Sequence, residues 1–177
     1  EVAKIMALIP DRNWNEVKTQ ASSFLATKKN ATRLQQARMK YALGAASLAS
    51  RDPNKALDYF AEALVLLHGS DENLGSASIT RSLDAYLRMP DVAQFLENSA
   101  VSAAVEARKH NPETVIPEMQ MKTRPLNVKE AAALYRLHEL MFPDRKLPAK
   151  YDAFAVSYKN PSAGTAEQAP AEAEKKQ

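Results

Sequence analysis

Residues 41–67 show two apolar periodicities of the helical kind, one after the other, with small residues at fixed places in both. In each, apolar side chains recur three or four positions apart, a spacing that places them on one stripe of an α-helix. Gly44, Ala56 and Ala63 stand where larger side chains would bury more apolar surface. The distance between packed helices depends on the side chains at their contact. The pattern therefore predicts two closely packed helices, with Phe60 filling the space between them.

The composition of the whole chain agrees with this local pattern. Alanine occurs 31 times and glycine four times among 177 residues. Alanine, leucine, lysine, glutamate, glutamine and arginine favour helix, whereas the strand formers valine, isoleucine and threonine are scarce. No alternation of apolar and polar residues persists for six positions. The chain is therefore predicted to be all-α.

Polar N-cap residues and prolines mark where the helices begin and end. Asp52 followed by Pro53 is typical of a helix start, and Pro90 ends the helix before it. Other predicted N-caps, three of them in capping boxes, are Asn13 with Glu16, Asn30, Asp91 with Gln94, and Asn127 with Glu130. The predicted helices are 13–28, 31–50, 53–67, 72–88, 91–109, 127–142 and 149–158. Turns between the first five are short, so neighbouring helices should pack antiparallel.

Two stretches interrupt the helical order. Residues 110–127 contain three prolines, which exclude a long helix and predict an extended segment across the surface. From Asn160 onward there is no leucine, isoleucine, valine or aromatic residue, so this part cannot offset the entropy of ordering. We expect one helical domain, 1–159, followed by a disordered tail, 160–177.

Positive charge is concentrated in one interval of the chain. Between Glu16 and Asp52 there is no acidic residue, and seven lysines and arginines occur there. The members of the predicted basic patch are Lys28, Lys29, Arg33 and Lys40. A patch of one sign attracts an acidic partner and speeds its encounter, but it is also an ordinary solvated face. The sequence leaves both interpretations open.

Five residues in and around the opening stretch are spaced as in the tetratricopeptide repeat, a helix–turn–helix unit of about 34 residues. With the first position at Ala37, the matching residues are Leu43, Gly44, Ala56, Phe60 and Ala63. The departures are Lys40 and Ser47, where the family has aromatic residues, and His68 in place of the closing proline. The corresponding place in the predicted second helices recurs at intervals of 39, 37 and 38, and it holds Val17, Ala56, Ala93 and Ala131. The chain thus resembles this family over residues 10–145, with degenerate units around the repeat at 37–70.

The resemblance implies a concave surface lined by the first helix of each repeat. On the helix that begins the repeat, the residues implied to face a partner are Arg38, Tyr41, Ala45 and Leu48. The family's clamp for a terminal carboxylate uses lysine and asparagine where this chain has Tyr41 and Ala45, so that clamp is absent. A partner segment that is apolar or acidic fits these side chains better. Tyr41 also lies on the apolar stripe, so it is equally well explained as a core residue.

Signatures of chemistry are missing from the sequence. There is no cysteine, and the three histidines are dispersed, so no thiol chemistry and no metal site are predicted. The "HELMF" stretch at 138–142 has Phe142 where a zinc-binding HExxH motif needs its second histidine. The four glycines form no phosphate-binding loop. We therefore predict no catalytic residue and no cofactor.

These observations favour a non-enzymatic adaptor that holds a protein or peptide partner in a helical-repeat groove. The alternatives are a structural subunit of a larger assembly and, with less support, a nucleic-acid-binding protein that lacks a known motif. No apolar run reaches the ~18 residues that span a bilayer, so a soluble protein is expected. The sequence begins at Glu1, so both the cytoplasm and an extracytoplasmic compartment reached after removal of a targeting segment stay open.

Overall fold

The computed structural model describes residues 1–97, 103, 106–107, 109–111 and 125–158. Within these residues every regular element is helical and no strand occurs, which confirms the all-α prediction. The predicted extended segment falls mostly on residues outside this part of the chain, and so does the predicted tail. Both remain predictions. None of the described helices is long and apolar enough to cross a membrane.

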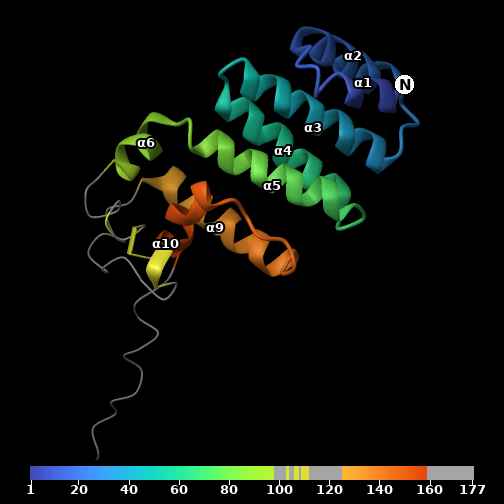
Figure 1. The fold of residues 1–177 in the computed structure, drawn as a ribbon. Helices are drawn as coiled ribbons and strands as arrows, with labels where there is room; N and C mark the ends of the chain where they lie inside the picture. Colours follow the sequence, from blue (N-terminus) through green and yellow to red (C-terminus); the bar gives the residue numbers. More distant parts are fainter. Residues whose placement is uncertain (98–102, 104–105, 108, 112–124, 159–177) are drawn as a thin grey trace, which may run out of the picture.

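The helices pack largely in the order in which the chain forms them (Figure 1). Their bounds are α1 Val2–Ala7, α2 Trp14–Thr27, α3 Arg33–Ala49, α4 Pro53–Leu67, α5 Glu72–Tyr86, α6 Pro90–Leu96, α9 Leu126–Met141, the 3-10 turn η1 Ala149–Tyr151, and α10 Asp152–Tyr158. Helix α3 contacts α1, α2, α4 and α5, and α9 then packs between α5 and α10. Neighbouring helices pack in antiparallel fashion, as their short connections predict.

The close contact predicted between α3 and α4 is present. Phe60, Ala56 and Ala63 are fully buried, and Gly44 is buried opposite the Phe60 ring. A Cβ atom added at Gly44 would lie 2.6 Å from Cε1 of Phe60, closer than real side chains approach. Tyr41 packs on the same ring, with centroids 5.7 Å apart. The absence of a side chain at Gly44 is therefore what admits the Phe60 ring between the two helices.

Two helix starts are fixed by aspartate caps in the expected places. The Asp52 carboxylate accepts a hydrogen bond from the Lys55 amide at 3.1 Å, ahead of a proline at the first helical position of α4. The Asp71 carboxylate does the same for the Leu74 amide at 3.0 Å, at the start of α5. Each cap satisfies an amide that has no partner within its helix.

The other predicted caps are wrong in detail. Helix α3 begins after Thr32, which forms a capping box with Gln35, and not after Asn30. Asn13 precedes α2 but makes no cap bond, because its amide donates to the Glu16 carboxylate at 2.6 Å. The boxes predicted at Asp91 and Asn127 do not form either. These two side chains hydrogen-bond each other at 2.9 Å and so join α6 to α9.

Prolines set the starts of these two later helices. Pro90 is the first residue of α6 and Pro125 immediately precedes α9, and the fixed φ of proline suits both places. Helix α6 ends at Leu96, so the continuous helix predicted over 91–109 does not form as one element, and most of its second half lies outside the described residues. Helix α1 was not predicted, because six residues are too few to show a helical period.

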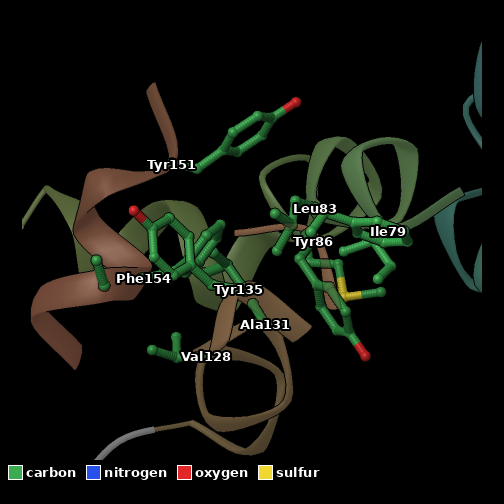
Figure 2. Packing of buried hydrophobic residues seen from close by; sticks show 12 residues of the cluster. Ile79, Leu83, Tyr86, Val128, Ala131, Tyr135, Tyr151 and Phe154 are labelled. Atoms are coloured by element: carbon green, nitrogen blue, oxygen red, sulfur yellow. The ribbon is translucent and has the colours of Figure 1, made fainter. Parts of the chain in front are cut away.

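A second core joins α5, α9 and α10 (Figure 2). Its fully buried members include Ile79, Leu83, Val128, Ala131, Tyr151 and Phe154. The Tyr86 hydroxyl donates to the Glu130 carboxylate at 2.9 Å, and burial together with this bond raises the pKa of Tyr86. This core holds α5 in place, and α5 forms one wall of the groove described below.

His138 is a buried polar residue of α9, with 1% of its surface exposed. Its Nε2 lies 2.8 Å from the Ser76 hydroxyl, and its ring packs on Phe142 with centroids 5.2 Å apart. Its Nδ1 atom is buried without a hydrogen-bond partner. Burial, with the nearby Arg145, lowers the pKa of His138, so the neutral ring is favoured in the folded protein.

Candidate partner-binding groove

Two cavities of about 580 Å³ each follow one another along α3. The apolar cavity is lined by Val2, Ala3, Met6, Arg38, Tyr41, Asp71, Asn73, Leu74 and Ala77. The basic cavity is lined by Ile9, Pro10, Arg12, Trp14, Ala45, Leu48, Ala49, Arg81 and Arg88. In both, α3 contributes the centre, α1 and the turn after it contribute one wall, and α5 contributes the other. We call the two cavities together the α3 groove.

The order of the lining residues gives the direction of the helices. Residue numbers rise from the apolar cavity to the basic cavity in α3, in α5 with the turn after it, and from α1 into the turn that follows it. These three helices therefore run in the same direction, while α4 packs between α3 and α5 as their antiparallel neighbour. Parallel helices on one side of a helical stack are the arrangement in which stacked helical hairpins create an extended binding surface.

The apolar cavity contains one ion pair among mostly apolar side chains. The Arg38 guanidinium lies 3.5 Å from the Asp71 carboxylate, so the positive charge of Arg38 is partly neutralised. Tyr41 is half-buried and contacts Phe60 on its inner side while it lines the cavity on its outer side. The two interpretations of Tyr41, core residue and groove residue, are therefore compatible.

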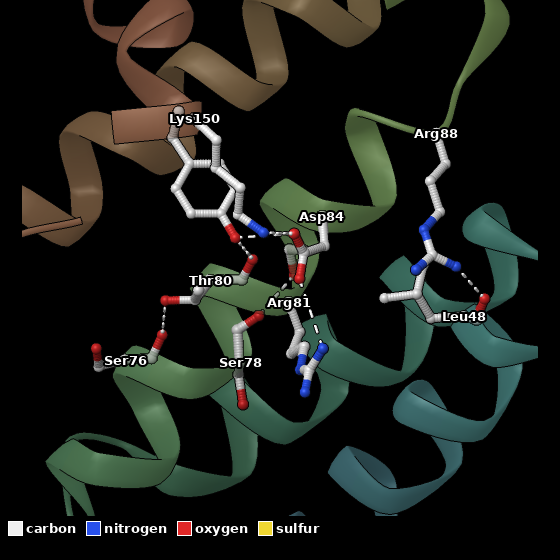
Figure 3. A network of polar contacts seen from close by, with 10 residues as sticks. Leu48, Ser76, Ser78, Thr80, Arg81, Asp84, Arg88 and Lys150 are labelled. Carbon is white, nitrogen blue, oxygen red and sulfur yellow. Dashed lines mark hydrogen bonds and ion pairs between the residues drawn. The ribbon is translucent and has the colours of Figure 1, made fainter. Parts of the chain in front are cut away.

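The basic cavity has three arginines and no acidic residue in its lining. One nitrogen of Arg88 donates to the backbone carbonyl of Leu48 at 2.6 Å, near the end of α3 (Figure 3). Arg81 lies 3.6 Å from Asp84 on the next turn of α5, and Arg12 projects from the turn between α1 and α2. Trp14 and Leu48 add apolar surface beside these guanidinium groups.

Asp84 is shared by several donors, so it does not neutralise Arg81 alone. Its carboxylate accepts a hydrogen bond from the Lys150 ammonium at 2.5 Å and another from the Tyr151 hydroxyl at 2.9 Å. The Tyr151 hydroxyl also lies 3.2 Å from the Thr80 carbonyl (Figure 3). The bond to Asp84 raises the pKa of Lys150, and burial raises the pKa of Tyr151. The cluster ties η1 to α5 and leaves the arginine side of the groove with an excess of positive charge.

All four residues predicted to bind a partner lie along the α3 groove. Arg38 and Tyr41 line the apolar cavity, and Ala45 and Leu48 line the basic cavity. Their spacing of three and four positions places them on one face of α3. Their role in binding stays a prediction.

The residues of the predicted basic patch have different surroundings in the structure. Lys28 and Lys29 line a third cavity of about 730 Å³ beside the start of α1, where Lys28 pairs with Glu1 at 3.3 Å. Lys40 forms an ion pair with Glu62 of α4 and lies 5.4 Å from the centre of the Tyr59 ring. Arg33 is exposed at the first residue of α3. Lys28 and Lys40 thus pair with different neighbours, and the role of the patch in binding stays a prediction.

Sequence reasoning missed the three arginines of the basic cavity. Arg12 lies just before the interval without acidic residues, and Arg81 and Arg88 lie well after it. Arg81 lies on α5 whereas Arg88 lies in the turn after it, so no spacing within one helix signals the group. Trp14 is half-buried and lines the same cavity.

No group of histidine, aspartate and glutamate residues suited to a metal ion occurs among the residues that the structure describes. Comparison with protein-family models, with characterised proteins and with solved structures found no match to this chain. The structure thus supports an all-helical protein with helices packed in sequence-adjacent pairs.

Proposed function

We propose that this protein is a non-enzymatic adaptor or scaffold of tetratricopeptide-like architecture. It holds a segment of a partner protein along α3, between α1 and α5. Support for the architecture comes from the match at residues 37–70, in which Gly44 receives the Phe60 ring between the paired helices. In the proposal, α1 with α2, and α3 with α4, are consecutive hairpins whose first helices line the groove.

The observation that carries the proposal is that two cavities follow one another along one helix. An enzyme site is usually a single concave pocket with converging polar groups, whereas a bound chain segment needs a longer track. The α3 groove offers side chains over the distance from Arg38 to Ala49, or roughly 16 Å at 1.5 Å per residue. That length suits about five residues of extended chain at ~3.3 Å per residue.

A second function is favoured by a different observation, the exposed apolar side chains of α9. Among the described residues, four of the five large apolar side chains with the greatest exposure lie on this helix, namely Leu126, Leu137, Leu140 and Met141. Leu137, Leu140 and Met141 are three and four positions apart, so they share one face. A contiguous apolar face suits contact with another protein. The protein is then a subunit of a larger assembly, with α9 as its contact surface.

Photo-crosslinking from the groove tests the adaptor proposal. A photoreactive residue is placed at Ala77 in the apolar cavity or at Ala49 in the basic cavity. Matched controls carry it at Ala61 and Val65, which are exposed on α4 and line none of the three cavities. The proposal predicts that one partner is captured from both groove positions and from neither control.

The captured partner is then purified and its affinity measured against Ala77→Trp and Ala61→Trp. Filling the apolar cavity should weaken binding strongly, and the same change on α4 should leave it unaltered. Equal effects of the two substitutions, or capture from the α4 positions alone, would contradict the groove. Capture from Leu140 instead would favour the assembly subunit.

A further inference from the structure

We infer that the α3 groove selects a partner segment with acidic residues at one end and an apolar residue about three positions away. The acidic residues bind in the basic cavity and the apolar residue binds in the apolar cavity. This inference rests on the proposed function and specifies the chemistry of the partner.

The charge of the basic cavity is the first argument. Arg12, Arg81 and Arg88 line it together, and no carboxylate is among its lining residues. Asp84, the nearest acidic partner of Arg81, also accepts bonds from Lys150 and Tyr151. A hollow lined by charges of one sign focuses its field and concentrates ions of the opposite sign. The cavity is therefore complementary to an anion.

The free donors of the arginines are the second argument. A guanidinium carries five N–H groups in a planar fork that matches a carboxylate with two parallel bonds. One Arg88 nitrogen donates to the Leu48 carbonyl, which fixes the side chain beside α3 and leaves other N–H groups of Arg88 for a ligand. Arg12 is held by its turn, where its amide donates to the Ile9 carbonyl at 3.1 Å. The Arg88 side chain is thus positioned before a ligand binds, and the backbone that carries Arg12 is fixed.

The contrast between the two cavities sets the spacing. Tyr41 and Leu74 provide apolar surface in one cavity, and the only charges lining it are the paired Arg38 and Asp71. From Tyr41 to Leu48 the helix rises by roughly 10 Å at 1.5 Å per residue. An extended peptide covers that distance in about three residues at ~3.3 Å per residue. A chain segment, unlike a small anion, can fill both cavities at once.

Trp14 gives a direct readout, because it is the single tryptophan of the chain and lines the basic cavity. The probe is a peptide capped at both ends, acetyl-Leu-Ser-Gly-Glu-Asp-Glu-amide, titrated while Trp14 fluorescence is recorded. Its control carries lysine in place of each acidic residue. The acidic peptide should alter the fluorescence in a saturable way and bind far more tightly than the lysine peptide. Its affinity should fall as salt rises.

Paired variants assign the effect to the cavity. The double variant Arg12→Gln with Arg81→Gln should lower the affinity for the acidic peptide about tenfold, because each partly exposed ion pair contributes a few-fold in affinity. The control combines Arg33→Gln with Arg136→Gln, which removes two exposed arginines outside the groove, one of them in an ion pair with Glu139 at 3.1 Å. Urea unfolding of both variants verifies that they fold. The control should bind the peptide as the original protein does.

The outcomes separate this inference from the proposed function. Equal binding of the acidic and lysine peptides, or equal weakening by the two double variants, overturns the acidic preference. A single-stranded oligonucleotide that matches the peptide in Trp14 response and affinity overturns it as well, since the cavity then takes any polyanion. If the acidic peptide does not bind while Ala77→Trp still weakens binding of the captured partner, the groove stands and only the inferred chemistry of the partner segment is wrong. If the peptide binds but Ala77→Trp has no effect on the partner, the proposed function fails.

Discussion

Replacing Gly44 with alanine tests the packing on which the groove depends. The added Cβ would lie 2.6 Å from Cε1, 2.7 Å from Cδ1 and 3.0 Å from Cζ of Phe60. Carbon atoms pack best at about 3.5–4.0 Å, so the ring must move by roughly 1 Å. Phe60 is fully buried and clusters with Tyr41 and Leu48, and a densely packed core gives its ring little room to move.

Two effects of opposite sign decide the result. Alanine is more favourable than glycine in a helix by about 1 kcal/mol, and overpacking a filled core costs about 1–3 kcal/mol. Gly44→Ala should therefore lower the free energy of unfolding by up to about 2 kcal/mol, the difference between these estimates. In a Phe60→Leu background the overlap with the ring is removed. Gly44→Ala should then raise the free energy of unfolding by up to about 1 kcal/mol.

The measurement is urea unfolding of the four proteins in this double-mutant cycle, followed by far-ultraviolet circular dichroism. We expect a coupling free energy of about 1–3 kcal/mol between the two positions. Gly75→Ala is the matched control, since its added Cβ meets only Phe142, with its closest contact at 3.1 Å. That change should be nearly neutral. The reasoning is refuted if Gly44→Ala stabilises the protein equally in both backgrounds.

Three further predictions concern a buried histidine, a polar cluster and an exposed face. Burial lowers the pKa of His138 below its ordinary value of 6.5, so the unfolded chain binds a proton first as pH falls. The free energy of unfolding should then decrease as pH falls through about 6.5, and His138→Gln should lose that part of the decrease in urea unfolding across pH. Tyr151→Phe removes the hydroxyl bonded to Asp84 at 2.9 Å and should cost about 1–2 kcal/mol of unfolding free energy, measured in the same assay. If α9 is an assembly surface, analytical ultracentrifugation should show self-association or partner association that Leu140→Lys abolishes and Val65→Lys does not.

The helical hairpin at the centre of the fold could be predicted because its signals are local. The spacing of Gly44, Ala56 and Phe60 predicts the close contact between the two helices, and Asp52 caps the helix that directly follows it. The face of α3 that lines the groove was implied by the resemblance to the tetratricopeptide repeat.

Two of the cap predictions that failed depend on partners distant in the sequence. Asp91 and Asn127 are good N-cap residues, yet their side chains hydrogen-bond each other, between α6 and α9. Nothing near Asn127 in the sequence indicates that Asp91 is its neighbour. A residue type that favours a cap also favours other hydrogen bonds, and tertiary packing decides between them.

The basic cavity could not be predicted for the same reason. It brings Arg12, from the turn after α1, into one cavity with Arg81 of α5 and Arg88 of the turn after α5, and α3 lies between these segments. The sequence shows the excess of positive charge between Glu16 and Asp52, but the structure directs Lys40 of that interval toward Glu62. Charge counted along the chain therefore does not show which side chains share a cavity.

Hydrogen exchange of the protein with and without its purified partner tests the central claim most directly. Binding in the α3 groove predicts slower amide exchange in residues 2–14, 38–49 and 71–88, with α4 unchanged. Protection confined to α9, around Leu126 and Leu140, would contradict the groove and assign the contact to the exposed apolar face.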